Sequence, residues 1–184
     1  MWGPDGRRWH FESGSLALDF GYTGDYGYDQ PGWERLHEPG DLHTWVESRF
    51  GRLDVPVSPE QFLRALTVRR AITTLAHAAA DGTEFDHHSI DVLNDTAAAT
   101  PIRPYLPGGS VPAPPPTLPA VLSSIAGNAI DVLSSSDQRV RRCAAGDCEL
   151  IFFDHSRPNA RRWCTMARCG NRAKVRAHRA STER

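Results

Sequence analysis

Residues 143–169, CAAGDCELIFFDHSRPNARRWCTMARC, contain all four cysteines of this 184-residue chain. Four residues separate Cys143 from Cys148, fifteen residues follow, and four more separate Cys164 from Cys169. Zinc binds four thiolates at the corners of a tetrahedron. Two close pairs reach that geometry at little entropic cost, because each pair closes only a short loop. The spacing therefore predicts one structural zinc ion bound by the four cysteines.

The same sequence is also compatible with other chemical states of the four cysteines. Disulfides suit a small secreted protein, but the amino terminus, MWGPDGRRWHFESG, has charges and no apolar run of signal-peptide type. An iron–sulfur cluster also takes four thiolates, and buried free thiols are a further alternative. A catalytic zinc is less expected, because four thiolates leave no position for water. His155 lies between the pairs and could replace a cysteine, although we expect it to be a surface or hydrogen-bonding residue.

Charge is unevenly distributed along the chain, whose formal net charge is −1. Residues 139–184 contain eleven arginines and one lysine against four carboxylates, a net charge of +8, which leaves −9 for residues 1–138. Such a basic end is typical of a chain that meets a polyanion such as nucleic acid. The alternative is that the two halves neutralise each other within the protein or between subunits.

Composition and motifs narrow the class of protein. No apolar run approaches the ~20 residues that a membrane-spanning helix needs. With clustered cysteines and no signal peptide, we expect a reducing, cytoplasmic location. The chain has no G-x-S-x-G, no phosphate-binding glycine loop and no H-E-x-x-H, so we do not expect an enzyme.

Apolar side chains recur with helical spacing through the middle of the chain. The helices expected from this spacing cover residues 41–50, 59–80, 87–99 and 118–135. Asp41 is expected to cap the first, and Ser58 before Pro59 the second. Helix is excluded through most of the proline-rich segment 101–119, which suggests a hairpin around Gly108-Gly109, an extended crossing or a linker.

The two ends of the chain give weaker patterns. Residues 16–20 could form a short strand or the first turn of a buried helix, and the aromatic residues of the turn-rich segment after them are expected to cap a core. Strands are expected at residues 139–148 and 149–154, with Phe152 and Phe153 covering the metal site and docking it on the helices. Residues 170–181 read as a final basic helix, in which Asn171 is expected to act as a cap.

Residues 141–179 resemble the CGNR zinc finger family, whose name describes Cys169-Gly170-Asn171-Arg172 in this chain. Members share a cysteine pair, an aromatic strand ending near Asp-x-Ser-Arg, an Arg-Arg-Trp-Cys segment and a basic helix after CGNR. Those positions are filled here by Asp154, Ser156, Arg157, Arg161, Arg162, Trp163 and Cys164.

The amino-terminal part is similar to the ABATE domain that usually precedes this finger. SGSLALDF, DLHTWVE, LRALTVRRAI and Leu93-Asn94 match it in order. The resemblance implies a stress-induced transcription regulator whose finger binds DNA. Together the patterns predict a mainly α protein. Residues 1–138 would form a helical ABATE-like domain with a short proline-rich hairpin, and residues 139–184 a four-cysteine zinc finger with a short β-hairpin and a terminal helix.

Two functions are compatible with these patterns. In the first, the zinc finger binds DNA, or RNA instead, and the helical domain senses a small-molecule effector or forms a homodimer. The nucleic-acid contacts would come from the basic residues Arg157, Arg161, Arg162, Arg168, Arg172, Lys174, Arg176 and Arg179. In the second, the finger is a zinc-stapled interaction or ligand-sensing module whose arginines pair with the acidic helical domain, without nucleic-acid binding.

Overall fold

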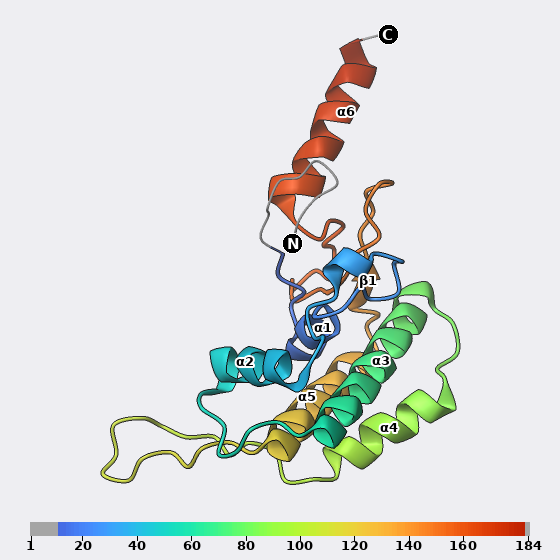
Figure 1. The fold of residues 1–184 in the computed structure, drawn as a ribbon. Coiled ribbons are helices and arrows are strands. Elements are labelled where there is room, and N and C mark those ends of the chain that lie inside the picture. Colours follow the sequence, from blue (N-terminus) through green and yellow to red (C-terminus); the bar gives the residue numbers. More distant parts are fainter. Residues whose placement is uncertain (1–10, 183–184) are drawn as a thin grey trace.

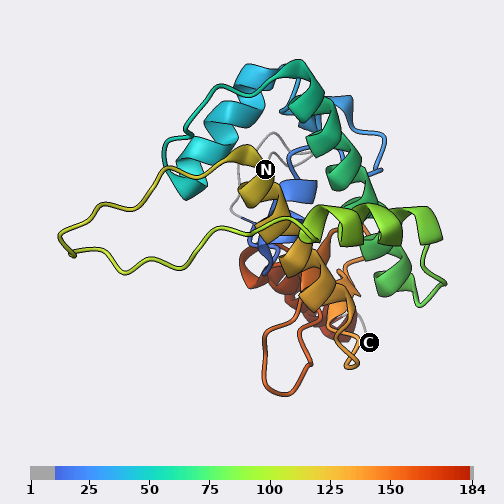
Figure 2. The same cartoon turned by 90° about the horizontal axis from the view of Figure 1, so that it is seen from below.

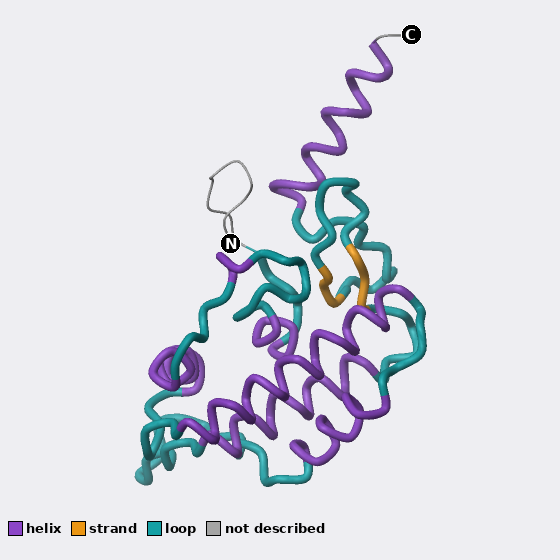
Figure 3. Tube along the Cα trace, turned by 45° about the vertical axis from the view of Figure 1, so that its right-hand side comes forward, coloured by secondary structure: helices purple, strands orange, loops and turns teal. Residues whose placement is uncertain are grey.

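The computed structural model describes residues 11–182 and is mainly α-helical, as expected (Figure 1). Helices α3, α4 and α5 pack against one another, and the short helix α1 lies across α3 and α5. Helix α6 projects away from this body, at the end opposite α4 (Figures 1 and 3). The elements in chain order are α1 (Leu16–Gly21), η1 (Pro31–Trp33), α2 (Pro39–Phe50), α3 (Pro59–Asp81), α4 (His87–Ala97), α5 (Leu118–Leu133), β1 (Val140–Arg142), β2 (Ile151–Phe153), η2 (Met166–Gly170) and α6 (Asn171–Thr182).

The main core lies between α3 and α5. Apolar side chains three or four residues apart bury one face of α3, among them Val68, Ile72 and Leu75. Val121 and Ile125 of α5 are fully buried against the same cluster. Burying each such side chain contributes about 1.5–3 kcal/mol, so this packing supports the body that carries the carboxyl-terminal finger.

Local capping explains where the helices begin and end. The Ser58 hydroxyl accepts the amide of Gln61 at 3.2 Å, which confirms the predicted start of α3, and Gly82 ends that helix in the left-handed conformation. The prediction for Asp41 is wrong. Helix α2 begins at Pro39, and the Asp41 carboxylate reaches back to the amide of Glu38 at 3.1 Å, because it stands at the third helical position.

Two uncertain segments are resolved by tertiary packing. Residues 16–20 form a helix rather than a strand, because the Ser15 side chain caps it and its apolar face packs on α3 and α5. The predicted proline-rich hairpin is wrong in detail. Residues 101–116 reverse direction near Gly108-Gly109 and project from the body, but they form no strand pair, since proline has no amide to donate (Figure 2).

The two short strands form the predicted antiparallel hairpin, with Arg141 opposite Phe152. It is shorter than expected because the chain turns into the first cysteine pair directly after Arg142. A wide π-helical turn, η2, leads into α6, and the Asn171 side chain there donates to the carbonyl of Ala167 at 3.4 Å instead of capping the helix. Within residues 11–182, every helix is too short or too polar to cross a membrane.

Candidate metal centre and basic surface

Two tight turns present the cysteines. In the first, residues 143–148, the amide of Cys143 donates to the carbonyl of Leu150 and the amide of Cys148 to that of Ala145, both at 2.9 Å. In the second, residues 164–169, the amide of Cys169 donates to the carbonyl of Thr165 at 3.1 Å. These backbone bonds hold the two turns that bring each cysteine pair together.

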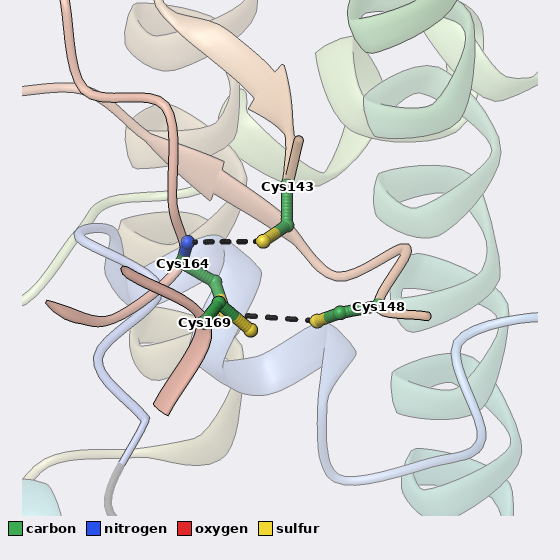
Figure 4. A group of neighbouring side chains, drawn as sticks. All are labelled: Cys143, Cys148, Cys164 and Cys169. Carbon is green, nitrogen blue, oxygen red and sulfur yellow. Dashed lines mark hydrogen bonds between the residues drawn. The ribbon is translucent and has the colours of Figure 1, made fainter. Parts of the chain in front are cut away.

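All four sulfur atoms meet in one place (Figure 4). They lie within 4.8 Å of one another, and Cys164 Sγ is 3.7 Å from Cys148 Sγ and 3.6 Å from Cys169 Sγ. With Zn–S bonds of ~2.3 Å, the edge of a regular tetrahedron is about 3.8 Å. The observed spacing therefore fits one tetrahedral ion. A disulfide needs S–S near ~2.05 Å, and a multi-iron cluster binds its thiolates to different irons.

Hydrogen bonds to the sulfur atoms, and the pKa values of the thiols, also agree with a site for one metal ion. The amide of Cys164 donates to Cys143 Sγ at 3.4 Å, as expected for a thiolate acceptor. Hydrogen bonds from Cys148 and Cys164 lower the pKa of Cys143 to about 2, and the bond with Cys143 raises the pKa of Cys148 to about 12. On their own, the crowded sulfurs thus keep some protons. A divalent cation would allow all four to be thiolates.

Aromatic side chains cover the cysteine cluster. Phe152 is fully buried and packs among the cysteines, whereas Phe153 on the opposite face of β2 packs with residues of the helical domain. The division follows from alternation along a strand, and it agrees with the roles expected for this pair. Tyr22, Tyr28 and Trp33 also pack on the cluster, so the aromatics of the amino-terminal loop cap the core of the finger.

The helical domain holds β2 through two tyrosine hydroxyls. Tyr22 Oη accepts the amide of Ile151 at 2.7 Å and donates to its carbonyl at 3.0 Å. Tyr28 Oη donates to the carbonyl of Glu149 at 2.8 Å. The guanidinium of Arg142 binds both oxygens of Asp81 at the end of α3. The finger is therefore attached to the helical domain by side chains far away in the sequence.

Asp154 organises the loop between the cysteine pairs. Its carboxylate is fully buried and accepts the amides of Ser156 and Arg161, each at 2.8 Å. Burial raises the pKa of this carboxyl, but the hydrogen bonds outweigh burial and the net pKa lies below the ordinary value. Asp154 is thus a charged residue whose role is to hold the loop. It forms no side-chain ion pair with Arg157 or Arg161, although such a pair would be expected if the arginines of the finger were neutralised by carboxylates.

Two of the eight predicted nucleic-acid contacts are engaged inside the finger. The Arg161 guanidinium donates to the carbonyls of Trp163 and Cys164 and stacks 4.3 Å from the centroid of the Phe152 ring. Arg172 donates to Cys169 Sγ at 3.4 Å and pairs with Asp147 at 2.8 Å. The hydrogen bond to Cys169 raises the pKa of Arg172. Both arginines therefore lie where they stabilise the site itself.

The other predicted contacts lie nearer the solvent. In the described part of the chain, four of them form no ion pair: Arg157, Arg162, Lys174 and Arg179, all exposed. Arg176 is exposed and shares Asp147 with Arg172, and Arg168 is half-buried. A groove of about 850 Å³ runs at the base of α6, and Arg162, Lys174 and Arg176 line it. Exposed cations thus gather around the root of α6.

His155 is exposed and donates a ring N–H to the carbonyl of Gly14, as expected for a surface, hydrogen-bonding histidine, and the metal-binding group consists of the four cysteines without it. Asp147, which was only counted as a charge, orients α6 through Arg172 and Arg176. Its position between the first two cysteines is the one sequence signal that could have singled it out.

Comparison with known families gives two matches. Residues 14–136 match the ABATE model, described as "Putative stress-induced transcription regulator", and residues 139–181 match the CGNR zinc finger model. No curated protein matches this chain. The boundary between the two matches lies just before β1.

Proposed function

The chain belongs to the ABATE family and carries a CGNR zinc finger, and on this premise we propose that it is a DNA-binding transcription regulator. In this proposal Cys143, Cys148, Cys164 and Cys169 hold one structural zinc ion, and the finger presents α6 to DNA. The stress response named by the family and a cytoplasmic location belong to the same proposal. An effector and a homodimer stay predictions.

The observation that carries the proposal is the contrast between the first residues of α6, 171–173, here called its root, and the rest of the helix, residues 174–182, here called its shaft. Its root is fixed, because Arg172 binds both Cys169 Sγ and Asp147. Its shaft projects from the body (Figure 1). Lys174, Arg176 and Arg179 on this part of the helix are exposed. A rigidly anchored helix with exposed cations suits the phosphates and guanine edges of a DNA major groove.

Zinc would supply the rigidity of this root. A structural zinc site contributes about 10–16 kcal/mol of apparent folding free energy, which a segment with two three-residue strands needs. The protein brings the four sulfur atoms together and excludes water from them with the Phe152 ring. It also places the Arg172 guanidinium against the sulfur of Cys169, which would carry negative charge. With four thiolates, no position is left for a reactive water.

A salt titration tests DNA binding. Zinc-loaded, reduced protein is titrated against a labelled random-sequence duplex between 50 and 200 mM salt, and affinity is read by fluorescence anisotropy. We expect the logarithm of affinity to fall by ~0.9 for each phosphate neutralised, per decade of salt. The double variant Lys174→Gln/Arg179→Gln should reduce that slope by about 2.

Arg103→Gln is the matched control, because Arg103 is exposed on the proline-rich loop, away from the finger. It should bind like the unchanged protein. Zinc content is measured for every variant, since loss of the metal would mimic loss of DNA contacts. A duplex that does not bind, a slope near zero, or equal effects of the control and the double variant would contradict the proposal and favour the interaction module.

A further inference from the structure

The groove at the base of α6 has an unusual lining. The first cysteine turn, residues 160–163 and α6 enclose its volume of about 850 Å³, which lies in the range of sites that bind small organic molecules. Several small residues line it, among them Ala144, Ala145 and Ala160. In the part of the chain that the structure describes, no carboxylate lines it, whereas Arg162, Lys174 and Arg176 do.

An aromatic ring with a guanidinium stacked on it and an exposed methionine also line this groove. The Arg162 guanidinium stacks 4.4 Å from the centroid of the Trp163 ring, and Met166 lies beside them with its side chain exposed. Aromatic rings and stacked guanidinium planes are the surfaces on which proteins hold unstacked bases. The alanines and glycines in the lining have short side chains or none, so a planar ring can approach the backbone there closely.

The concave shape decides between duplex and single strand. In a duplex the bases are stacked between two backbones, so a base cannot lie against the side chains that line the groove unless it leaves the stack. An unstacked nucleotide can enter it, with its base on the apolar wall and its phosphate at the cationic rim. Lys174 and Arg176 belong to both surfaces, whereas Arg179 lies farther along α6 and does not line the groove, so a duplex can still contact that end of the helix.

We propose that this groove binds a single unstacked nucleotide, with its base against Trp163 and Met166 and its phosphate at Lys174 and Arg176. The inference rests on the proposed nucleic-acid function and names the form of nucleic acid that the groove accepts. The same chemistry is present in a single strand of DNA or RNA and in a free nucleoside monophosphate, so the experiment uses both.

The probes are a dT12 single strand, the dA12·dT12 duplex and adenosine 5′-monophosphate, each titrated into zinc-loaded protein. Binding is followed by anisotropy and by quenching of tryptophan fluorescence, and Trp163→Phe assigns the quenched signal to this tryptophan among the five of the chain. Base–aromatic stacking contributes about 1–3 kcal/mol, which corresponds to roughly 5- to 150-fold in affinity. We expect Ala160→Phe, which fills the groove from an exposed position, to weaken dT12 binding at least about tenfold.

Two controls make the result specific. Ala113→Phe adds the same ring at an exposed position of the proline-rich loop and should leave dT12 binding unchanged. Duplex affinity should change less than about twofold in Ala160→Phe, because the duplex contacts the shaft of α6. Zinc content and circular dichroism of each variant show that the finger is folded.

The outcomes separate this inference from the proposed function. If the duplex binds but dT12 neither quenches Trp163 nor responds to Ala160→Phe, the groove proposal is wrong and DNA binding stands. If neither the duplex nor dT12 binds, the proposed function is wrong, and binding of adenosine 5′-monophosphate then tests the groove proposal. Quenching of Trp163 by the monophosphate in the unchanged protein but not in Ala160→Phe would support a nucleotide site, and its absence would overturn it.

Discussion

Replacing Tyr22 by phenylalanine tests how the helical domain holds the finger. The Tyr22 ring stacks on Tyr26 with 4.0 Å between centroids, and Phe11 packs edge-on against it at 5.0 Å, contacts that phenylalanine keeps. Only the hydroxyl is lost. It serves both the amide and the carbonyl of Ile151, a residue with no exposed surface. Burial raises the pKa of Tyr22 well above its ordinary value, so the hydroxyl keeps its proton.

The expected cost follows from the two groups left without a partner. An unsatisfied buried backbone group costs about 1–3 kcal/mol, so the loss of both partners in Tyr22→Phe should reduce the free energy of unfolding by about 2–6 kcal/mol. For a chain of this size, each kcal/mol corresponds to a midpoint shift of about 2–4 °C, which gives a shift of roughly 4–24 °C. The measurement is urea and thermal unfolding of reduced, zinc-loaded protein.

Tyr28→Phe is the matched control. Its hydroxyl donates to the carbonyl of Glu149 and is also hydrogen-bonded to the Tyr22 hydroxyl. Glu149 is exposed and its carbonyl also accepts from Arg142 Nη1 at 3.3 Å, so Tyr28→Phe leaves this carbonyl with a partner. The loss should be below about 1 kcal/mol. If Tyr22→Phe costs no more than Tyr28→Phe, or less than about 1 kcal/mol, then the Tyr22 hydroxyl does not hold β2, and the attachment must depend on apolar packing alone.

Three further changes test other parts of the finger. A Cβ on Gly170 would lie 2.5 Å from the sulfur of the exposed Met166 side chain, which can move aside, and 2.9 Å from Cδ1 of Trp163, whose ring packs on the cysteine cluster. Gly170→Ala should therefore cost about 1 kcal/mol in urea unfolding, whereas Gly146→Ala, with open space around it, should be neutral. Asp154→Asn should cost about 3 kcal/mol. Because the folded pKa of Asp154 is depressed, its contribution is complete above about pH 4 and is lost as the pH falls through the lower folded pKa, so the stability gap between the two proteins should narrow at acid pH. Cys164→Ser, or removal of metal by a chelator, should unfold residues 139–182 and leave α1 to α5 folded; loss of most helical circular dichroism would contradict this.

The local patterns of the sequence were sufficient for the helices and for the cysteine site. Ser58-Pro59 and Gly82 fix the two ends of α3, because capping depends on residues within one turn of the helix. The four cysteines meet because each pair is separated by only four residues, so a tight turn brings each pair together. Asp41 shows the limit of this reasoning, since any of several polar residues near a helix start can act as the cap.

Sequence alone determined that a basic, four-cysteine finger follows a helical domain, because spacing, periodicity and net charge are properties of short stretches of chain. Only the tertiary structure decided which cations are engaged internally and which face the solvent. Arg172 is bound by Asp147, 25 residues away, and Tyr22 holds Ile151, 129 residues away. Side chains so distant in the chain meet only after the helices have packed, so no local pattern records their contacts.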